Sequence, residues 1–455
     1  MKDMRTFISE YEQAYPEDFV RFKEEVDPKY QLSAVVQKFD SAGRQPVIVF
    51  ENVKGYDTPV VCNIESGMEK LAIAMGVAPG EVEEAYRKAE EKVISGDNSF
   101  APVEVKASEA PVKEVIIPRE KVDFNKFPII SHHMGEVPYL TRAVGVARDP
   151  EDGYLHAAYY RLMVKGKNHM VTHLTPGRHL WYMYKKAEAM GKPLPMAFYV
   201  GSNPAWSFGV QSRISHPPTE FDVIGALQGE PLQMVRCETN DILVPAATEM
   251  VIEGELRPGG LEDEGPWRDF TRYHQTAQRH SFSVNAVTCR KDLIFQDSGA
   301  WVKNGVRYAI IPIEVFLERE LKRVVPSVKQ FKTGSSHMIG YISMDKKHAS
   351  EPKMAIMSAF THELYLKYIY VFDTDIDLNN ESERDWALAT RAQADRDFFI
   401  IPGILGTDLD LSAPQEAFMT KVGFDATAKP FRSHYPELGK ISEEYMSETD
   451  ISKYL

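Results

Sequence analysis

The hydrophobic positions in the first hundred residues alternate between strand-like and helix-like spacing. Residues 47–50 form a short apolar run that predicts a buried strand. Residues 66–75 carry apolar side chains at helical spacing, and residues 79–92 place acids first and bases last, as a helix dipole favours. A polar, turn-rich stretch follows at residues 95–102. We therefore expect an N-terminal α/β domain over residues 1–102.

From residue 103 the pattern changes to one strand after another. Short segments rich in β-branched and aromatic residues recur, with a single helical interruption at residues 177–190. Such a series of strands is typical of a barrel. We expect a β-rich, split-barrel-like central domain over residues 103–308. The predicted strands are residues 143–147, 158–164, 170–174, 196–200 and 282–289.

The last third of the chain returns to mixed α/β spacing, which predicts a C-terminal α/β domain over residues 309–455. Its final segment, residues 433–455, is charged and loosely helical, so we interpret it as a packing or oligomerisation arm. The fold class is thus a multidomain α+β or α/β protein. The predicted elements are a helix at 315–323, strands at 324–326 and 368–372, and a helix at 382–391 that opens on Ser382.

Composition limits the classes of partner. A chain of 455 residues with 43% hydrophobic and 26% charged residues is ordinary globular protein, long enough for two or three domains. The net charge of -13 argues against nucleic acid or an anionic membrane as the main partner. Three scattered cysteines, no apolar run long enough to span a bilayer and no signal-like N-terminus predict a cytoplasmic protein.

Common catalytic motifs are missing from the sequence. It contains no phosphate-binding P-loop, no dinucleotide-binding GxGxxG after a strand, no HExxH and no GxSxG. Residues 373–377 resemble the start of a calcium loop, but Leu378 stands where glycine is needed and Arg384 where glutamate is needed. We therefore interpret this segment as a loop that caps a buried strand.

Two acidic residues flank a Gly-Pro pair in the segment that begins at Glu264 and ends at Asp269. A turn there would direct both carboxyl groups at one small volume, and Arg161 is a candidate cation for the same place. Two carboxyls and a guanidinium can bind a carboxylate and exchange a proton. The alternative from spacing alone is an acidic surface turn with a neighbouring arginine.

A second group of residues has the chemistry of a metal and phosphate site. His156 begins the strand that carries Arg161, His179 follows a Pro-Gly-Arg turn at an expected helix start, and Glu220 follows a rigid Pro-Pro turn. Two imidazoles and a carboxylate can hold a divalent metal. Alternation along a regular strand places His156 and Arg161 on opposite faces. Each histidine taken alone can equally be structural, since the chain has 13.

Seven segments together resemble the UbiD family of decarboxylases that depend on prenylated FMN (prFMN), and the resemblance covers nearly the whole chain. Each segment is weak alone, but all seven occur in the family's order. They are residues 140–150, 160–164, 176–179, 219–220, 238–254, 264–269 and 421–427.

The resemblance implies roles for the acidic group. Arg161, Glu264 and Asp269 fall on the family's catalytic triad. Arg161 would pair with Glu264 and orient the substrate carboxylate, and Asp269 would return a proton to the carbon that loses CO2. The second acid is aspartate here, one methylene shorter than the glutamate of the fungal cinnamate-type members, which changes its reach to the substrate.

The resemblance also implies a cofactor site. His156, His179 and Glu220 fall on ligands of a divalent metal, usually Mn2+, that bridges to the flavin phosphate; His156 departs from the asparagine that relatives often have. Histidine can ligate manganese as well, so the site is expected to survive. A potassium ion is a further expected cofactor. The expected cofactor contacts are His156, Tyr160, Arg161, Arg178, His179 and Glu220.

The implied reaction is the reversible, non-oxidative decarboxylation of an aromatic or heteroaromatic acid, with CO2 as product. Arg307 and His337 are candidate substrate contacts, and an arginine at the pocket wall would favour a dicarboxylic, furan-type acid. Arg307 can equally be a surface residue. A flavin prenyltransferase would supply the cofactor, and a homodimer or higher oligomer is expected.

Two other functions stay open. The chain could be a UbiD-like subunit of a phenol or phenyl-phosphate carboxylase complex, although its complete triad argues against a catalytically dead scaffold. It could also be a flavin-free, metal-dependent hydrolase built on His156, His179 and Glu220. That function would leave the acidic pair without a role.

Overall fold

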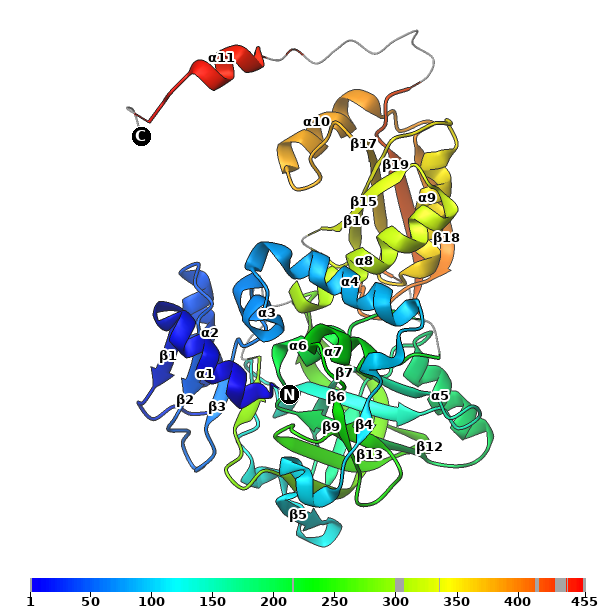
Figure 1. Cartoon of the computed structure of the whole chain (residues 1–455). Helices are drawn as coiled ribbons and strands as arrows, with labels where there is room; N and C mark the ends of the chain where they lie inside the picture. Colours follow the sequence, from blue (N-terminus) through cyan, green and yellow to red (C-terminus); the bar gives the residue numbers. More distant parts are fainter. Residues whose placement is uncertain are drawn as a thin grey trace. The chain divides into compact units, whose positions relative to one another are not determined.

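The computed structural model describes residues 2–214, 217–298, 307–334, 336–413, 417–429, 439 and 441–452, without the side chains of residues 307 and 308 (Figure 1). The chain divides into two compact units, and each is described by itself. The first comprises Met1–Leu317 and Leu405–Met419, and the second comprises Glu318–Ile404 and Thr420–Leu455. The domain boundaries expected near residues 102 and 308 stay predictions.

The N-terminal part of the first unit is a small α/β layer. Its four-stranded sheet has the order β1-β2-β3-β14, so that β14 (Phe295–Asp297) pairs with β3 from more than 230 residues further along the chain. The predicted strand at 47–50 and both predicted helices are confirmed, and the first helix ends at Gly76 in a left-handed conformation. The other elements are α1 (Met4–Ala14), β1 (Phe19–Phe22), α2 (Gln31–Ser41), β2 (Val47–Phe50), β3 (Val60–Cys62), α3 (Met68–Met75) and α4 (Val82–Ile94).

Six strands close into a barrel at the centre of the first unit. The order is β12-β9-β6-β7-β8-β13, and β12 also pairs with β13, which closes the ring. Closure satisfies the backbone hydrogen bonds of both would-be edges. The barrel prediction is therefore confirmed. The strands are β6 (Tyr139–Arg148), β7 (Leu155–Val164), β8 (His169–Thr172), β9 (Leu194–Val200), β12 (Met250–Arg268) and β13 (His274–Cys289).

Shorter elements surround the barrel. Strand β5 (Val115–Pro118) pairs with β13, and a separate sheet has the order β11-β10-β4. Helix α5 contacts β9 and β12, while α6 and α7 pack together and α7 contacts β7. The bounds are β4 (Val103–Glu104), α5 (His179–Ala189), α6 (Pro204–Gly209), α7 (Glu220–Gln228), β10 (Gln233–Arg236) and β11 (Leu243–Pro245).

The second unit is a five-stranded sheet of order β15-β16-β17-β19-β18 with helices. Helix α8 (Arg307–Val324) leads into it and extends through Pro312. The remaining elements are β15 (Val328–Thr333), β16 (Ile339–Met344), α9 (Glu351–His362), β17 (Tyr368–Asp373), α10 (Glu381–Arg391), β18 (Phe398–Leu405), β19 (Phe418–Asp425) and α11 (Glu443–Glu448).

Two local predictions in this unit are wrong. The strand expected at 324–326 is the end of α8 and the turn after it, because the Glu/Lys/Arg-rich helix continues one residue further than its apolar spacing suggested. Helix α10 is capped by Asn380 and not by Ser382, since the Asn380 side chain accepts from the N–H groups of Ser382 and Glu383. The predicted strand at 368–372 is confirmed within β17.

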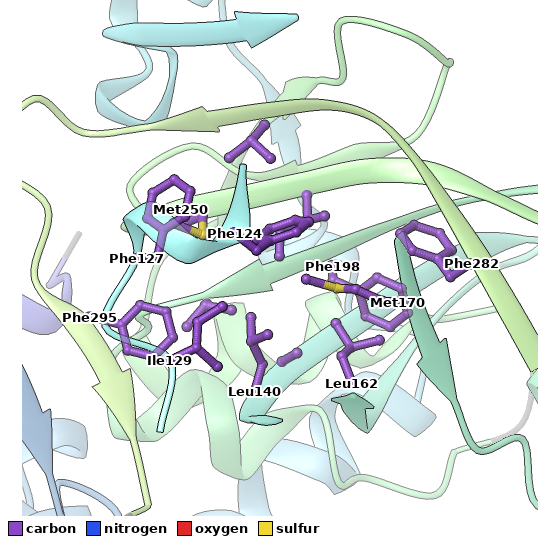
Figure 2. Packing of buried hydrophobic residues seen from close by; sticks show 14 of the residues in the cluster. Phe124, Phe127, Ile129, Leu140, Leu162, Met170, Phe198, Met250, Phe282 and Phe295 are labelled. Carbon is purple, nitrogen blue, oxygen red and sulfur yellow. The ribbon is translucent and has the colours of Figure 1, made fainter. Parts of the chain in front are cut away.

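The main hydrophobic core fills the barrel and extends to the N-terminal layer. Phe198 and Phe282 meet edge to face with ring centroids 4.9 Å apart, and Met170 lies close to both (Figure 2). Phe124, Phe127 and Ile129 lie in the same cluster (Figure 2). Close packing of these side chains fixes the barrel strands and therefore the positions of the polar side chains that the strands carry. In the described part of the chain, no helix is long and apolar enough to cross a membrane.

Replacing Gly254 of β12 by alanine should destabilise the barrel. A Cβ atom there would lie 2.1 Å from the carbonyl oxygen of Ser283 and 2.7 Å from Phe282 Cζ. Overpacking of this kind costs about 1–3 kcal/mol, which a lower thermal unfolding midpoint would reveal. Gly80→Ala is the control, because a Cβ at Gly80 would meet no atom within 4 Å. An unchanged midpoint for Gly254→Ala would contradict the prediction.

Candidate active site

A buried ion pair joins two strands of the barrel. Arg161 on β7 donates to Glu264 on β12 through Nε at 2.6 Å from Oε1 and through Nη2 at 2.8 Å from Oε2. The Glu264 side chain is 3% exposed and that of Arg161 is 15% exposed. Burial lowers the pKa of Arg161, but the charge and hydrogen bonds of Glu264 outweigh it and hold that pKa above its ordinary value. Arg161 and Glu264 therefore form a bidentate ion pair.

The Gly-Pro segment forms a strand irregularity where the sequence suggested a turn. Glu264 pairs with Ala277 and Trp267 with Gln275, so Gly265 and Pro266 together oppose a single residue of β13. Such a bulge redirects the side chains on either side of it. The Trp267 ring then lies 5.9 Å from Arg161 Cζ.

Asp269 lies immediately after β12 and is buried. Its Oδ1 accepts from the backbone N–H of Thr271 at 2.8 Å and from the Thr271 hydroxyl at 2.6 Å. Its Oδ2 has a weaker contact, 3.5 Å from Gln275 Nε2. Arg161 also interacts electrostatically with Asp269. Thr271 thus anchors Oδ1, whereas Oδ2 is held only by the weaker contact with Gln275.

The two histidines and the glutamate expected to hold a metal do lie together. Ligand atoms of His156, His179 and Glu220 are all within 4.8 Å of one another. His156 Nδ1 is 2.8 Å from Glu220 Oε1, and Oε2 of Glu220 accepts from the N–H of Ala157 at 3.2 Å. Burial lowers the pKa of His179, and the charges of His156 and Arg178 lower it further. Neutral imidazoles and a carboxylate fit a divalent ion such as Mn2+.

Local structure explains how two of these ligands are presented. Glu220 is the first residue of α7, whose first turn is fixed because the Asp222 carboxylate accepts from the N–H and the hydroxyl of Thr219. His179 is the first residue of α5 and follows the capping residue Arg178. Helix starts present unpaired N–H groups, which favour an anion such as phosphate.

Strand β7 supplies residues to both clusters. Its pairing with β6 has one irregularity, where two residues of β6 stand opposite Arg161. Successive β7 side chains still alternate between two hydrophobic cores, with Tyr160 packed against one and Tyr159 against the other. Alternation therefore keeps His156 and Arg161 on opposite faces, as the sequence predicted. The candidate metal-binding group (His156, His179 and Glu220) and the acidic cluster around Arg161, Glu264 and Asp269 are thus separate, and β7 contributes one residue to each.

Three charged or titratable residues of the acidic cluster were missed by the sequence analysis. Arg279 Nε lies 3.6 Å from Glu264 Oε2, and its Nη2 pairs with Asp408 Oδ2 at 2.7 Å. His173 Nε2 is 3.3 Å from the same oxygen. Burial raises the pKa of Asp408, but His173 and Arg279 outweigh it and hold that pKa well below its usual range. No motif surrounds Asp408, so its role depends on the folding of residues 405–419 onto the first unit.

Tyr160, His337 and Arg307 were also predicted to contact the cofactor or the substrate. Tyr160 packs with its ring centroid 6.2 Å from that of Phe198, at the barrel core. His337 lies in the turn between β15 and β16 of the second unit, so its approach to the substrate stays a prediction. The side chain of Arg307 lies outside the described residues, although its backbone begins α8. Residues 373–377, which we interpreted as a loop that caps a buried strand, begin at the last residue of β17, and Asp373 and Asp375 there form ion pairs with Arg391.

Comparison with known families identifies the whole architecture. Residues 13–89, 103–301 and 308–426 match the N-terminal, Rift-related and C-terminal domains of the 3-octaprenyl-4-hydroxybenzoate carboxy-lyase family, UbiD. The chain belongs to the UbiD family. It therefore has the three-domain UbiD architecture and is a carboxy-lyase of the UbiD (de)carboxylase class.

Several known proteins are similar to this one over nearly their full length. The anhydromevalonate phosphate decarboxylase of Methanothermobacter thermautotrophicus is 28% identical over 93% of this chain and 96% of its own. The UbiD-class enzyme HmfF of Pelotomaculum thermopropionicum, solved with FMN, is 34% identical with a TM-score of 0.85 and full coverage of both chains. An evolved dimeric form of HmfF was solved with prFMN. The vanillic acid decarboxylase of Sedimentibacter hydroxybenzoicus is 26% identical, with a TM-score of 0.89 over 98% of both chains.

Acid should weaken the first unit through His280 of β13. Burial, and then the charge of His173, lower the pKa of His280 from its ordinary 6.5 to about 4. Below pH 6.5 the unfolded chain binds this proton and the folded chain does not, so stability falls as the pH drops from about 6.5 to about 4. His280→Phe, which keeps a ring against Tyr184, should remove about 2–3 kcal/mol of that loss. Parallel unfolding midpoints of both proteins across this pH range would contradict the assignment.

Proposed function

We propose that this UbiD enzyme is a reversible, non-oxidative decarboxylase of an aromatic or heteroaromatic acid and that it uses prFMN. The buried, two-bonded pair of Arg161 and Glu264, with Asp269 beside it, carries the proposal. A guanidinium that is already fixed by one carboxylate can orient a second carboxylate from the substrate. Similar enzymes solved with FMN and with prFMN support the cofactor.

Arg161, Glu264 and Asp269 have different roles in the proposed reaction. Arg161 holds the substrate carboxylate, and Glu264 keeps the guanidinium in place. The bond between the carboxyl carbon and its neighbour breaks, CO2 leaves, and Asp269 gives a proton to the carbon that remains, so that a C–H bond replaces the C–C bond. Bound prFMN would supply the acceptor for the electron pair left on that carbon. The anchored Oδ1 of Asp269 directs Oδ2 toward this transfer.

The second cluster is proposed to hold the cofactor. His156, His179 and Glu220 would hold Mn2+, whose positive charge, with that of Arg178, would help to bind the flavin phosphate. Tyr160 is a further proposed cofactor contact, and a potassium ion is proposed in addition. Coordinating groups within 4.8 Å of one another at the start of α5 and α7 support this assignment.

The proposed substrate is a furan-type dicarboxylic acid, for which Arg307 would bind the second carboxylate. A phosphorylated acid is the second candidate, because relatives that are 28% and 29% identical are anhydromevalonate phosphate decarboxylases. Both candidates carry an additional anionic group. Release of CO2 from furan-2,5-dicarboxylate, vanillate and anhydromevalonate phosphate would discriminate among them.

The expected partners follow from the same proposal. A flavin prenyltransferase would supply prFMN, and the enzyme would work in the cytoplasm, where the three buried, unpaired cysteines stay reduced. A homodimer or higher oligomer is supported by the dimeric form described for HmfF. Protein co-expressed with the prenyltransferase also separates the alternatives. A subunit of a larger carboxylase would be inactive alone, and a metal-dependent hydrolase would show no flavin absorption.

Glu220→Ala should lower bound manganese and bound flavin together, because Glu220 contacts His156 directly and supplies a carboxylate to the proposed metal site. Metal analysis and flavin absorbance of the purified protein measure the two. Glu230→Ala is the control, since Glu230 is an exposed acid just beyond the other end of α7. Retention of both ligands by Glu220→Ala at wild-type levels would refute the assignment.

Asp269→Asn should lower turnover by about 10²–10⁴-fold, the usual cost of losing one general acid. The amide keeps the size of the side chain but has no acidic proton to deliver, so flavin and metal content should not change. Turnover and incorporation of deuterium from heavy water into the product measure the effect. Asp263→Asn, at an exposed acid of the same strand, is the control. Near-normal turnover of Asp269→Asn would move the acid role to Glu264 or to water.

A further inference from the structure

A third polar cluster lies beside the acidic one, and the proposed reaction gives it no role. It comprises His133, Glu136 and Arg268, with His274 at its edge. The Glu136 side chain is fully buried, that of His133 is 20% exposed and that of His274 is 40% exposed. A carboxylate this deep in a protein requires several donors to offset its desolvation.

Glu136 receives those donors from both sides. Its Oε1 accepts from the backbone N–H of Arg268 at 2.8 Å, and its Oε2 accepts from the backbone N–H of His133 at 2.9 Å. His133 Nδ1 is 3.1 Å from both oxygens. Burial raises the pKa of Glu136, but these hydrogen bonds outweigh it and leave that pKa below its ordinary value. Glu136 is therefore an ionised anchor.

The other nitrogen of His133 fixes the state of the ring. Arg268 Nη1 lies 3.0 Å from His133 Nε2. A guanidinium has donors only, so Nε2 must accept, and the proton of the neutral ring is on Nδ1, where it points at Glu136. The imidazole thus connects the Arg268 side chain to the carboxylate that already binds the Arg268 backbone.

The same contact argues against a metal at this place. The ligand atoms of His133, Glu136 and His274 are close enough for an ion. A metal on His133 Nδ1 would put the ring proton on Nε2, where it would face a donor of Arg268 in place of the acceptor that metal-binding histidines require. The positive charge of Arg268 opposes a cation as well.

This cluster holds the backbone at Arg268, between Trp267 and Asp269. Arg268 is preceded by Trp267, whose ring faces Arg161 and packs against Tyr139 with centroids 4.4 Å apart. It is followed by Asp269. Fixing both the N–H and the guanidinium of Arg268 removes the freedom of the segment to rotate, so its two neighbours point in defined directions.

We propose that Glu136 and His133 are positioning residues that act through Arg268 to aim Asp269 at the substrate and to seat Trp267 against Arg161. This inference rests on the proposed function of Asp269. We call Glu136, His133 and Arg268 together the clamp. A misplacement of about 1 Å in a catalytic group can lower the rate by about 10²-fold, so loss of the clamp should reduce turnover strongly although the clamp itself does not touch the substrate.

The test compares four variants of enzyme co-expressed with a flavin prenyltransferase, assayed on the best substrate among furan-2,5-dicarboxylate, vanillate and anhydromevalonate phosphate. His133→Ala and Glu136→Gln should lower kcat by about 10²-fold while KM and flavin content stay near wild type. His133→Gln should recover most of the activity, because its amide offers one donor and one acceptor. His274→Ala should behave like wild type, since its side chain lies at the edge of the cluster, 3.4 Å from Glu136, and its pairing with Arg268 across β12 and β13 is a backbone pairing that alanine keeps.

Hydrogen exchange separates this inference from the proposed function. In His133→Ala, the backbone amides of residues 267–272 should exchange faster than in wild type and in His274→Ala, whether or not any of the three acids is turned over. Faster exchange with no turnover by the wild type would count against the proposed function and support the clamp. Normal kcat in His133→Ala, unchanged exchange, or bound metal that His274→Ala removes would each overturn the clamp.

Discussion

The bidentate ion pair between Arg161 and Glu264 is the constraint around which this part of the structure is organised. An ion pair with so little exposure is stable only when its geometry is good and the neighbouring charges are balanced. The closed barrel meets the first condition, because β7 and β12 both belong to one ring of strands with a packed interior. A barrel that was open at β12 would leave either partner buried without its counter-charge.

The surrounding charges meet the second condition. Arg279 adds a second guanidinium near Glu264, and Asp408 balances it from a segment about 130 residues further along the chain. On the other side, Glu136 and His133 hold Arg268 by its backbone and by its side chain. These contacts fix the end of β12, the strand that carries Glu264.

The group of His156, His179 and Glu220 depends on a different kind of constraint. Its glutamate and one of its histidines are each the first residue of a helix, so capping residues and turns close in sequence determine where they point. His156 is the exception, because a barrel strand presents it. His156 and Arg161 lie on opposite faces of one strand. The two groups of charged residues to which they belong are therefore separated by the sheet.

The sequence by itself predicted many of the helices and strands, although not α6 and α7, together with the barrel, the family resemblance and the grouping of His156 with His179 and Glu220. These follow from local spacing, helix-start residues and motif order, which are read along the chain. It misjudged the segment from Glu264 to Asp269 as a turn and missed Arg279, Asp408, Glu136 and His133. Only the tertiary structure decided these, because strand register and the return of residues 405–419 bring together side chains that no local pattern relates.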